Sequence, residues 1–186
     1  MKAHKSRLFF VEIMEKCGII VTGAKDGSLK AWPLATLQHH SPPLWTFTNN
    51  GAITSTINAC AVDDDKGFII IGTLNDGVFG VNAKTGAKLW SNFVSCLNVC
   101  LDTVADRAYI AYCGESGGAG QLRCMNTTGD TLWLTNPMLG RQSIGRSMKT
   151  GIGMDRCAIH NCVFVGSDTD GVLRQFSCDD VRDEQR

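Results

Sequence analysis

The chain of 186 residues is 44% hydrophobic and 19% charged, which excludes a disordered or fibrous protein and allows one domain with a buried core. Its 18 basic and 18 acidic residues leave no net positive field that would attract nucleic acid or an anionic membrane. No run reaches the roughly 18 apolar residues that a membrane span requires. We therefore expect neither nucleic acid nor a membrane among its partners.

The first of four sequence repeats covers about residues 6–48. An apolar run over 9–15 is followed by GIIVTGAKDGSLKAW over 18–32, and Leu44-Trp45 closes the repeat. Lys25, Asp26 and the glycine after them separate two strand-like runs, and these residue types are typical of a hairpin turn. The repeat predicts short strands joined by tight turns.

The second repeat, about residues 55–92, shows the pattern best. The segment GFIIIGTLNDGVFGVNAKTGAKLW over 67–90 contains three strand-like runs, with turns at Asn75-Asp76-Gly77 and Lys84-Thr85-Gly86. An apolar run over 57–65 supplies a fourth strand. The unbroken apolar run at 69–71, closed by Gly72, is typical of a strand that neighbouring sheets cover on both faces.

The third repeat covers about 95–135 and the fourth about 150–178. The third has a turn at Gly129 and closes on Trp133, and the fourth has Gly166 at the end of an apolar run and a turn at Asp170-Gly171. The closing residues Trp45, Trp90 and Trp133 lie 45 and 43 residues apart. That spacing falls within the period of about 40–50 residues of β-propeller blades.

These repeats predict an all-β fold, namely a partial or small β-propeller of about four blades, each a four-stranded antiparallel meander, in a single domain over 1–186. We expect the three tryptophans to wedge between blades. Structural roles are also expected for the glycines of strand ends and turns, which are Gly72, Gly77, Gly86, Gly129, Gly166 and Gly171. Because propellers have about 4–8 blades and no fourth strand is evident after Phe176, we expect an incomplete ring.

The second and third repeats resemble the quinoprotein-type repeat of the pyrroloquinoline-quinone enzymes, in GFIIIGTLNDGVFGVNAKTGAKLW and MNTTGDTLW. Blades of that family commonly carry an aspartate where this chain has Asn82. The first repeat, VTGAKDGSLKAWPL, is more similar to a WD repeat, with Pro33 at the place of that family's aspartate. Both resemblances imply a propeller.

The quinoprotein resemblance has two functional implications. The quinone dehydrogenases of that family use calcium, a catalytic aspartate and often a disulfide between adjacent cysteines, and this chain has no adjacent cysteine pair. Many other proteins with this repeat bind proteins and catalyse nothing. The resemblance therefore implies a binding module, with a remnant or fragment of a quinone-dependent dehydrogenase, or the propeller portion of a larger multidomain enzyme, as the alternative.

No motif supplies a convincing chemical site. The segment from Gly140 to Ser147 has the spacing of a phosphate-binding loop, but glycines at 151 and 153 interrupt the helix that such a loop requires. The Asp63–Asp65 run matches a hairpin turn better than a calcium loop. Neither His39-His40, nor Cys96 with Cys100, nor Cys157, His160 and Cys162 has zinc-ligand spacing. We expect no catalytic residue, no metal and no cofactor.

The nine cysteines are odd in number and lie mostly inside apolar runs, and no secretory leader is recognisable. We therefore expect reduced, buried thiols and a cytoplasmic protein. If β-strands A to D follow one another in each blade, the B–C turns and the D–A connections lie at one end of the blades and form a loop face.

A protein or peptide is the partner that we expect at this loop face, because binding residues concentrate on loops held by a rigid scaffold. The candidates in the B–C turns are Lys25, Asp26, Asn75, Asp76, Glu115, Asp168 and Asp170. The long D–A connection over 136–153 is basic and adds Arg141 and Arg146. The blade edges also allow self-association, or further blades of a longer parent chain, to complete the ring.

Overall fold

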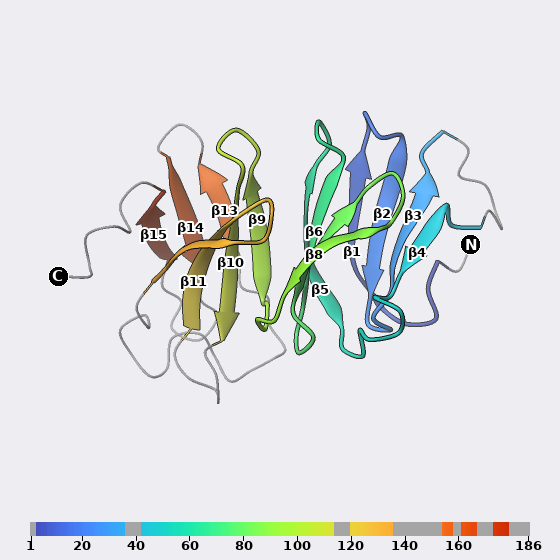
Figure 1. Ribbon diagram of the computed structural model, residues 1–186, viewed down its shortest axis with the longest axis horizontal. Coiled ribbons are helices and arrows are strands. Elements are labelled where there is room, and N and C mark those ends of the chain that lie inside the picture. The colour runs from blue at the N-terminus through green and yellow to red at the C-terminus, as the bar shows by residue number, and fades with distance from the viewer. Residues whose placement is uncertain are drawn as a thin grey trace. The chain divides into compact units, whose positions relative to one another are not determined.

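The computed structural model describes residues 3–35, 42–113, 120–135, 154–157, 161–166 and 173–178. These residues form fifteen strands in four antiparallel sheets. They contain no helix, and hence none long and apolar enough to span a membrane. The chain divides into two compact units, Met1–Cys96 and Leu97–Arg186, each with two sheets (Figure 1). The predicted all-β fold is confirmed, and we call the sheets blades one to four in chain order.

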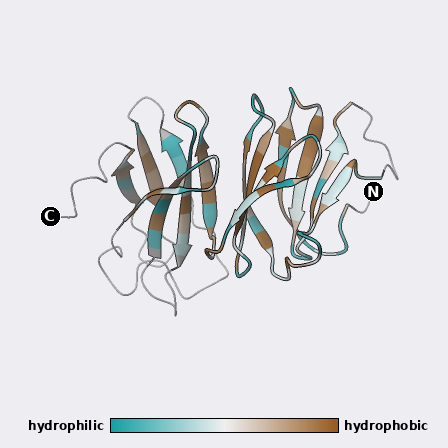
Figure 2. Cartoon of the chain, in the orientation of Figure 1, coloured by the Kyte–Doolittle hydropathy of each residue, from teal (hydrophilic) through white to brown (hydrophobic). Residues whose placement is uncertain are grey.

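The first unit contains blades one and two, which are both complete four-stranded meanders. Blade one consists of β1 (Leu8–Met14), β2 (Ile19–Ala24), β3 (Leu29–Pro33) and β4 (Trp45–Phe47). Blade two consists of β5 (Ile57–Asp63), β6 (Phe68–Thr73), β7 (Val78–Asn82) and β8 (Lys88–Asn92). Every residue of β6 is buried, which agrees with its unbroken apolar run, and Figure 2 shows β2 and β6 as mostly apolar and β4 as paler.

The second unit contains blades three and four. Blade three consists of β9 (Asn98–Asp102), β10 (Arg107–Cys113), β11 (Gly120–Asn126) and β12 (Thr131–Leu134). Blade four shows three strands within the described residues, β13 (Met154–Cys157), β14 (Cys162–Gly166) and β15 (Leu173–Ser177).

The turns of blade two depend on glycine and on an asparagine side chain. Gly77 and Gly86 have φ angles of 111° and 69°, a left-handed backbone that side chains with a Cβ rarely adopt. The side-chain oxygen of Asn82 accepts hydrogen bonds from the backbone N–H groups of Lys84 and Thr85, both at 3.0 Å. Asn126 closes the corresponding turn of blade three in the same way. A neutral amide therefore closes the turn where the quinoprotein-type repeat has aspartate.

Each blade has two faces, because side chains alternate along a strand. We call the face toward the next blade in the chain the forward face and the opposite one the backward face. The forward face of blade one and the backward face of blade two share one hydrophobic core. Blade one contributes Phe10, Val21, Ala31, Trp45 and Phe47, and blade two contributes Cys60, Val62, Ile69, Ile71, Phe79 and Val81.

Trp45 lies between blades one and two. Its indole Nε1–H donates to the backbone oxygen of Ala83 at 2.9 Å, and its ring covers Gly86 so closely that an added Cβ would lie 2.7 Å from Cδ2. Trp45 is the first residue of β4, not the last. The strand has three residues, and all three pair with β3. Trp90 packs over Gly80 within its own blade.

The second unit has its own core between blades three and four. Tyr109, Leu122 and Cys124 of blade three pack with Val163 and Val165 on the backward face of blade four. The ring of Trp133 lies 5.9 Å from that of Tyr109, measured between centroids. A buried ion pair of 2.5 Å joins Arg156 of β13 to Asp102 of β9. The same forward-to-backward contact therefore joins the two blades of each unit.

Candidate functional site

Two aspartates fasten the B–C turns of the first unit to the segments that precede the first strand of the same blade. Asp26 accepts hydrogen bonds from the backbone N–H of Lys5 at 3.2 Å and from the hydroxyl of Ser28 at 2.6 Å. Asp76 accepts from the backbone N–H groups of Thr54 and Ser55 at 3.0 and 2.7 Å. The same position of the repeat thus ties the D–A connection to the B–C turn in both blades.

Both carboxyl groups are held in the ionised form. Partial burial acts to raise the pKa of Asp76, but the hydrogen bonds from Ser55 and Thr54 outweigh it, so the pKa lies below the ordinary value. The pKa of Asp26 is lowered in the same way, since hydrogen bonds from Ser28 and from the backbone of Lys5 outweigh its desolvation. Both carboxylates therefore keep their negative charge and accept hydrogen bonds from groups of the chain itself.

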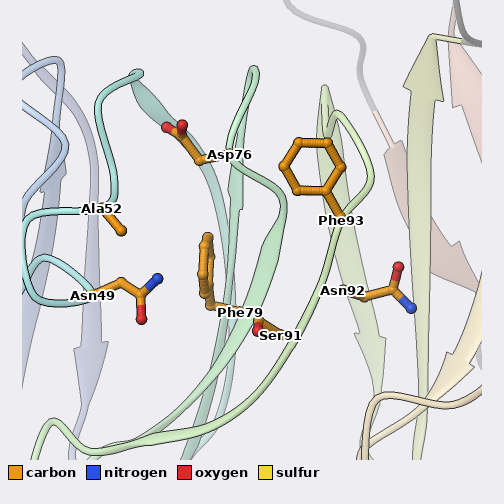
Figure 3. A pocket seen from close by; sticks show the side chains of 7 residues that line it. All are labelled: Asn49, Ala52, Asp76, Phe79, Ser91, Asn92 and Phe93. Carbon is orange, nitrogen blue, oxygen red and sulfur yellow. The ribbon is translucent and has the colours of Figure 1, made fainter.

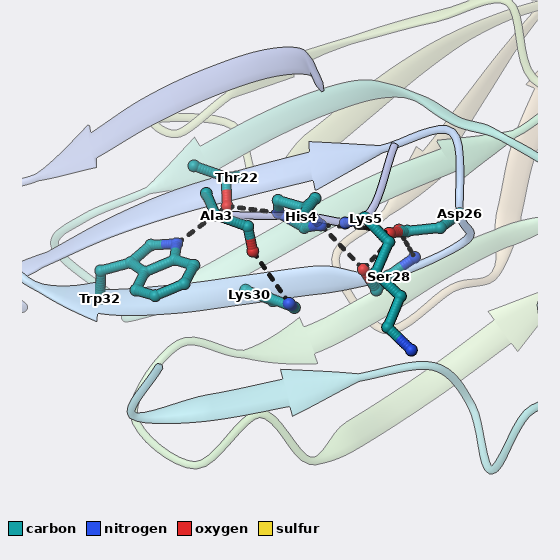
Figure 4. Close-up of polar contacts among 8 residues, drawn as sticks. All are labelled: Ala3, His4, Lys5, Thr22, Asp26, Ser28, Lys30 and Trp32. Atoms are coloured by element: carbon teal, nitrogen blue, oxygen red, sulfur yellow. Dashed lines mark hydrogen bonds and ion pairs between the residues drawn. The ribbon is translucent and has the colours of Figure 1, made fainter. Parts of the chain in front are cut away.

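A buried hydrogen-bonded chain extends from Asp26 into blade one (Figure 4). His4 Nδ1 lies 2.8 Å from the Ser28 hydroxyl, and His4 Nε2 lies 2.7 Å from the Thr22 hydroxyl. The indole N–H of Trp32 donates to the same Thr22 oxygen at 2.9 Å. If His4 carries a proton on Nδ1 only, every donor in this hydrogen-bonded series has an acceptor. The series then runs from Trp32 through Thr22, His4 and Ser28 to Asp26. The network therefore suits neutral His4.

This network predicts a pH dependence of stability. Burial lowers the pKa of His4, and Lys30 lowers it further, whereas Asp26 and Thr22 act in the opposite direction. A base with a lowered pKa in the folded state contributes its full stability above about pH 6.5 and loses it as the pH falls through the folded pKa. We expect the wild-type Tm to fall more steeply between about pH 7.5 and 5.5 than that of His4→Asn. Equal slopes in thermal melts followed by circular dichroism would contradict the assignment.

An open recess lies at the loop face of blade two (Figure 3). It has a volume of about 340 Å³ and is lined by Asn49, Ala52, Asp76, Phe79, Ser91, Asn92 and Phe93. The lining comes from the D–A connection before β5, from the B–C turn and from β7, β8 and the residue after β8. The D–A connection also reaches blade one, since a Cβ on Gly27 would lie 2.7 Å from the backbone oxygen of Ile53.

The recess combines an apolar surface with hydrogen-bonding groups. The buried ring of Phe79 lies near the centre of the lining, with Asp76 and Asn49 to one side and the ring of Phe93 on the other (Figure 3). Phe93 is 87% exposed, which is unusual for so large an apolar side chain. The lining of the recess contains one carboxylate, that of Asp76, and no lysine or arginine. Such a recess fits an apolar side chain whose flanking backbone bonds to amide and hydroxyl groups.

The structure brings one of the sequence-derived candidates into this recess, namely Asp76. Asn75 is exposed in the same turn, and Lys25 is exposed beside Asp26 in blade one. The other candidates, Glu115, Asp168, Asp170, Arg141 and Arg146, lie outside the described residues, as does Gly171. Sequence reasoning missed Phe93 and Asn49, although a phenylalanine directly after a predicted fourth strand was a detectable signal. Among the described residues, no three His, Cys, Asp or Glu side chains form a metal-binding group.

Comparison with known proteins identifies the architecture. No protein-family model matches the sequence, and no curated protein matches it. By structure, the chain is similar to the WD40 domain of Toxoplasma gondii coronin, with a TM-score of 0.71 and 10% identity over 94% of this chain and 43% of that one. WD40 repeats form the four-stranded blades of β-propellers. The fold is a β-propeller fold.

Two further structures agree with the propeller assignment. BamB from Moraxella catarrhalis is similar with a TM-score of 0.64 and 18% identity over 94% of this chain and 48% of that one. The computationally designed Ika4 protein is similar with a TM-score of 0.66 and 16% identity over 95% of this chain and 94% of that one. The chain therefore spans about half of the two natural chains and nearly all of the designed one.

Proposed function

We propose that the chain is a non-enzymatic propeller module that binds a protein or peptide segment at the loop face of blades one and two. The observation that carries the proposal is the recess around Phe79, with the almost fully exposed Phe93 at its rim. Exposed aromatic side chains beside a recess are typical of anchoring positions in protein interfaces. The likeness to a WD40 domain supports the same role at the level of the fold.

The proposed ligand is an extended peptide with one apolar side chain. That side chain fills the recess against Phe79 and Phe93, while Asn49 and Ser91 are placed to bond to the flanking peptide groups. The carboxylate of Asp76 favours a basic residue next to the apolar one. Because Asp76 already holds Thr54 and Ser55, the rim of the recess is fixed before the ligand arrives, which limits the entropy lost on binding.

The membership in the quinoprotein-type repeat family and the cytoplasmic location remain part of this proposal. Desolvation raises the pKa of Cys100 to about 12 and that of Cys124 to about 12, so both thiols stay protonated near neutral pH. Thiols with such pKa values are poor nucleophiles at neutral pH.

Peptide selection tests the proposal. Peptides are selected on the immobilised protein from a displayed library of random sequences, and the dissociation constant of the best one is measured by fluorescence anisotropy. We expect Phe93→Ser to weaken binding at least about tenfold, which corresponds to 1.4 kcal/mol. Val104→Ser is the matched control, because Val104 is 90% exposed on blade three and should leave the affinity unchanged. Failure to select any peptide that depends on Phe93 would reject the proposal.

A further inference from the structure

The backward face of blade one carries exposed apolar side chains along β1, whereas Thr22 and Trp32 of the same blade are buried in the network with His4. The four-residue turns after Met14 and Asp63 place β1 and β5 in the same register, so Val11 corresponds to Cys60 and Ile13 to Val62. In blade two, Cys60 and Val62 pack against the core shared with blade one. Their counterparts Val11 and Ile13 are each 56% exposed. Along β1, blade one therefore presents apolar side chains at the positions with which blade two packs on blade one.

The forward face of blade four, within the described residues, also carries apolar side chains that are not fully buried. The pairing of Cys157 with Cys162 matches that of Met14 with Ile19, so Phe164 corresponds to Val21. Val21 is fully buried in the core between blades one and two, whereas Phe164 is only partly buried. Leu173 lies on the same face, opposite Gly166, and is 67% exposed. Blade four thus presents the surface that blade one uses to receive the next blade.

These two surfaces are complementary in kind, because one forward-to-backward contact joins the blades inside each unit. We propose that a second copy of this chain covers both of them: the forward face of blade four of each copy packs on the backward face of blade one of the other. In this proposal the two contacts are equivalent, and a two-fold axis relates the two copies.

Two observations favour a second copy as the occupant. The chain spans 43% and 48% of the natural chains to which it is similar, so two copies have about the length of such a chain. The chain also carries both halves of the contact, and their apolar side chains, Val11 and Ile13 against Phe164 and Leu173, match those of the internal interface. This proposal does not depend on peptide binding, since none of these residues lines the recess.

Sedimentation and light scattering of the purified chain test the proposal. We expect a species of twice the 20.1 kDa chain mass at micromolar concentration. The double substitution Val11→Lys and Ile13→Lys should convert it to a monomer with an unchanged circular dichroism spectrum, because both side chains point away from the core. Val104→Lys, which changes a 90% exposed valine outside both faces, should leave the dimer intact. A wild-type monomer, which would result if further blades of a longer chain were the true occupant, overturns the proposal.

A mixing experiment distinguishes this contact from one between two identical faces. Leu173→Lys alone should also yield a monomer, because it alters the other half of the same contact. When the Leu173→Lys chain is mixed with the Val11→Lys, Ile13→Lys chain, one of the two contacts retains wild-type faces on both sides. We expect native mass spectrometry to detect heterodimers in the mixture and almost no homodimers of either variant. A mixture without heterodimers would contradict the proposed pairing.

Discussion

Replacement of Trp45 by alanine is expected to lower the free energy of unfolding by about 3 kcal/mol, at the lower end of the range for buried tryptophans because the indole is partly exposed. The indole fills the space between blades one and two, covers Gly86 and donates to the Ala83 oxygen at 2.9 Å. Its loss leaves a cavity between two rigid sheets, which cannot move together without breaking their own pairing. Urea unfolding followed by circular dichroism measures the effect.

Trp45→Phe separates the two contributions of that side chain. It keeps an aromatic ring over Gly86 but removes the hydrogen bond to Ala83, so a loss of about 1 kcal/mol is expected, together with a small packing term. An unfolding midpoint of Trp45→Ala equal to that of the wild type would show that the indole does not support the contact between the blades.

The blades could be predicted from the sequence because their signals are local. In blade two these signals are the Asn75-Asp76-Gly77 turn, the continuous apolar run of β6 and Gly86 of the turn before β8. Each acts over a few residues, and the strands lie where these signals place them. The role of Asn82 was also local in nature, since its side-chain oxygen accepts hydrogen bonds from Lys84 and Thr85 of the same turn. The propeller class followed from the repetition of these local patterns.

The details of the loop face could not be predicted, because they depend on contacts between distant segments. Asp76 and the residues that donate to it, Thr54 and Ser55, are about twenty residues apart in sequence, so the aspartate resembled a free loop residue. The recess requires the connection between blades one and two to lie beside β7 and the residue after β8, which follows only from the packing of the two blades on one another.

Gly86→Ala is expected to lower the free energy of unfolding by about 2–5 kcal/mol, as the sum of two effects. The φ angle of 69° costs an alanine about 1–2 kcal/mol. The new Cβ would lie 2.7 Å from Cδ2 of Trp45, and crowding in a packed interface adds about 1–3 kcal/mol. Gly51→Ala is the control, because Gly51 has a φ angle of 80° but no heavy atom within 4 Å of an added Cβ, so only the backbone effect should remain.

A double-mutant cycle tests whether the two contributions to Gly86→Ala are correctly assigned. In the Trp45→Ala background the crowding disappears, so Gly86→Ala should cost about as little as Gly51→Ala does in the wild type. The coupling between the two positions is then about 1–3 kcal/mol, equal to the crowding alone. Additive losses would mean that the indole yields to the methyl group without strain, and the close contact between blades one and two would then not limit which residues the turn accepts.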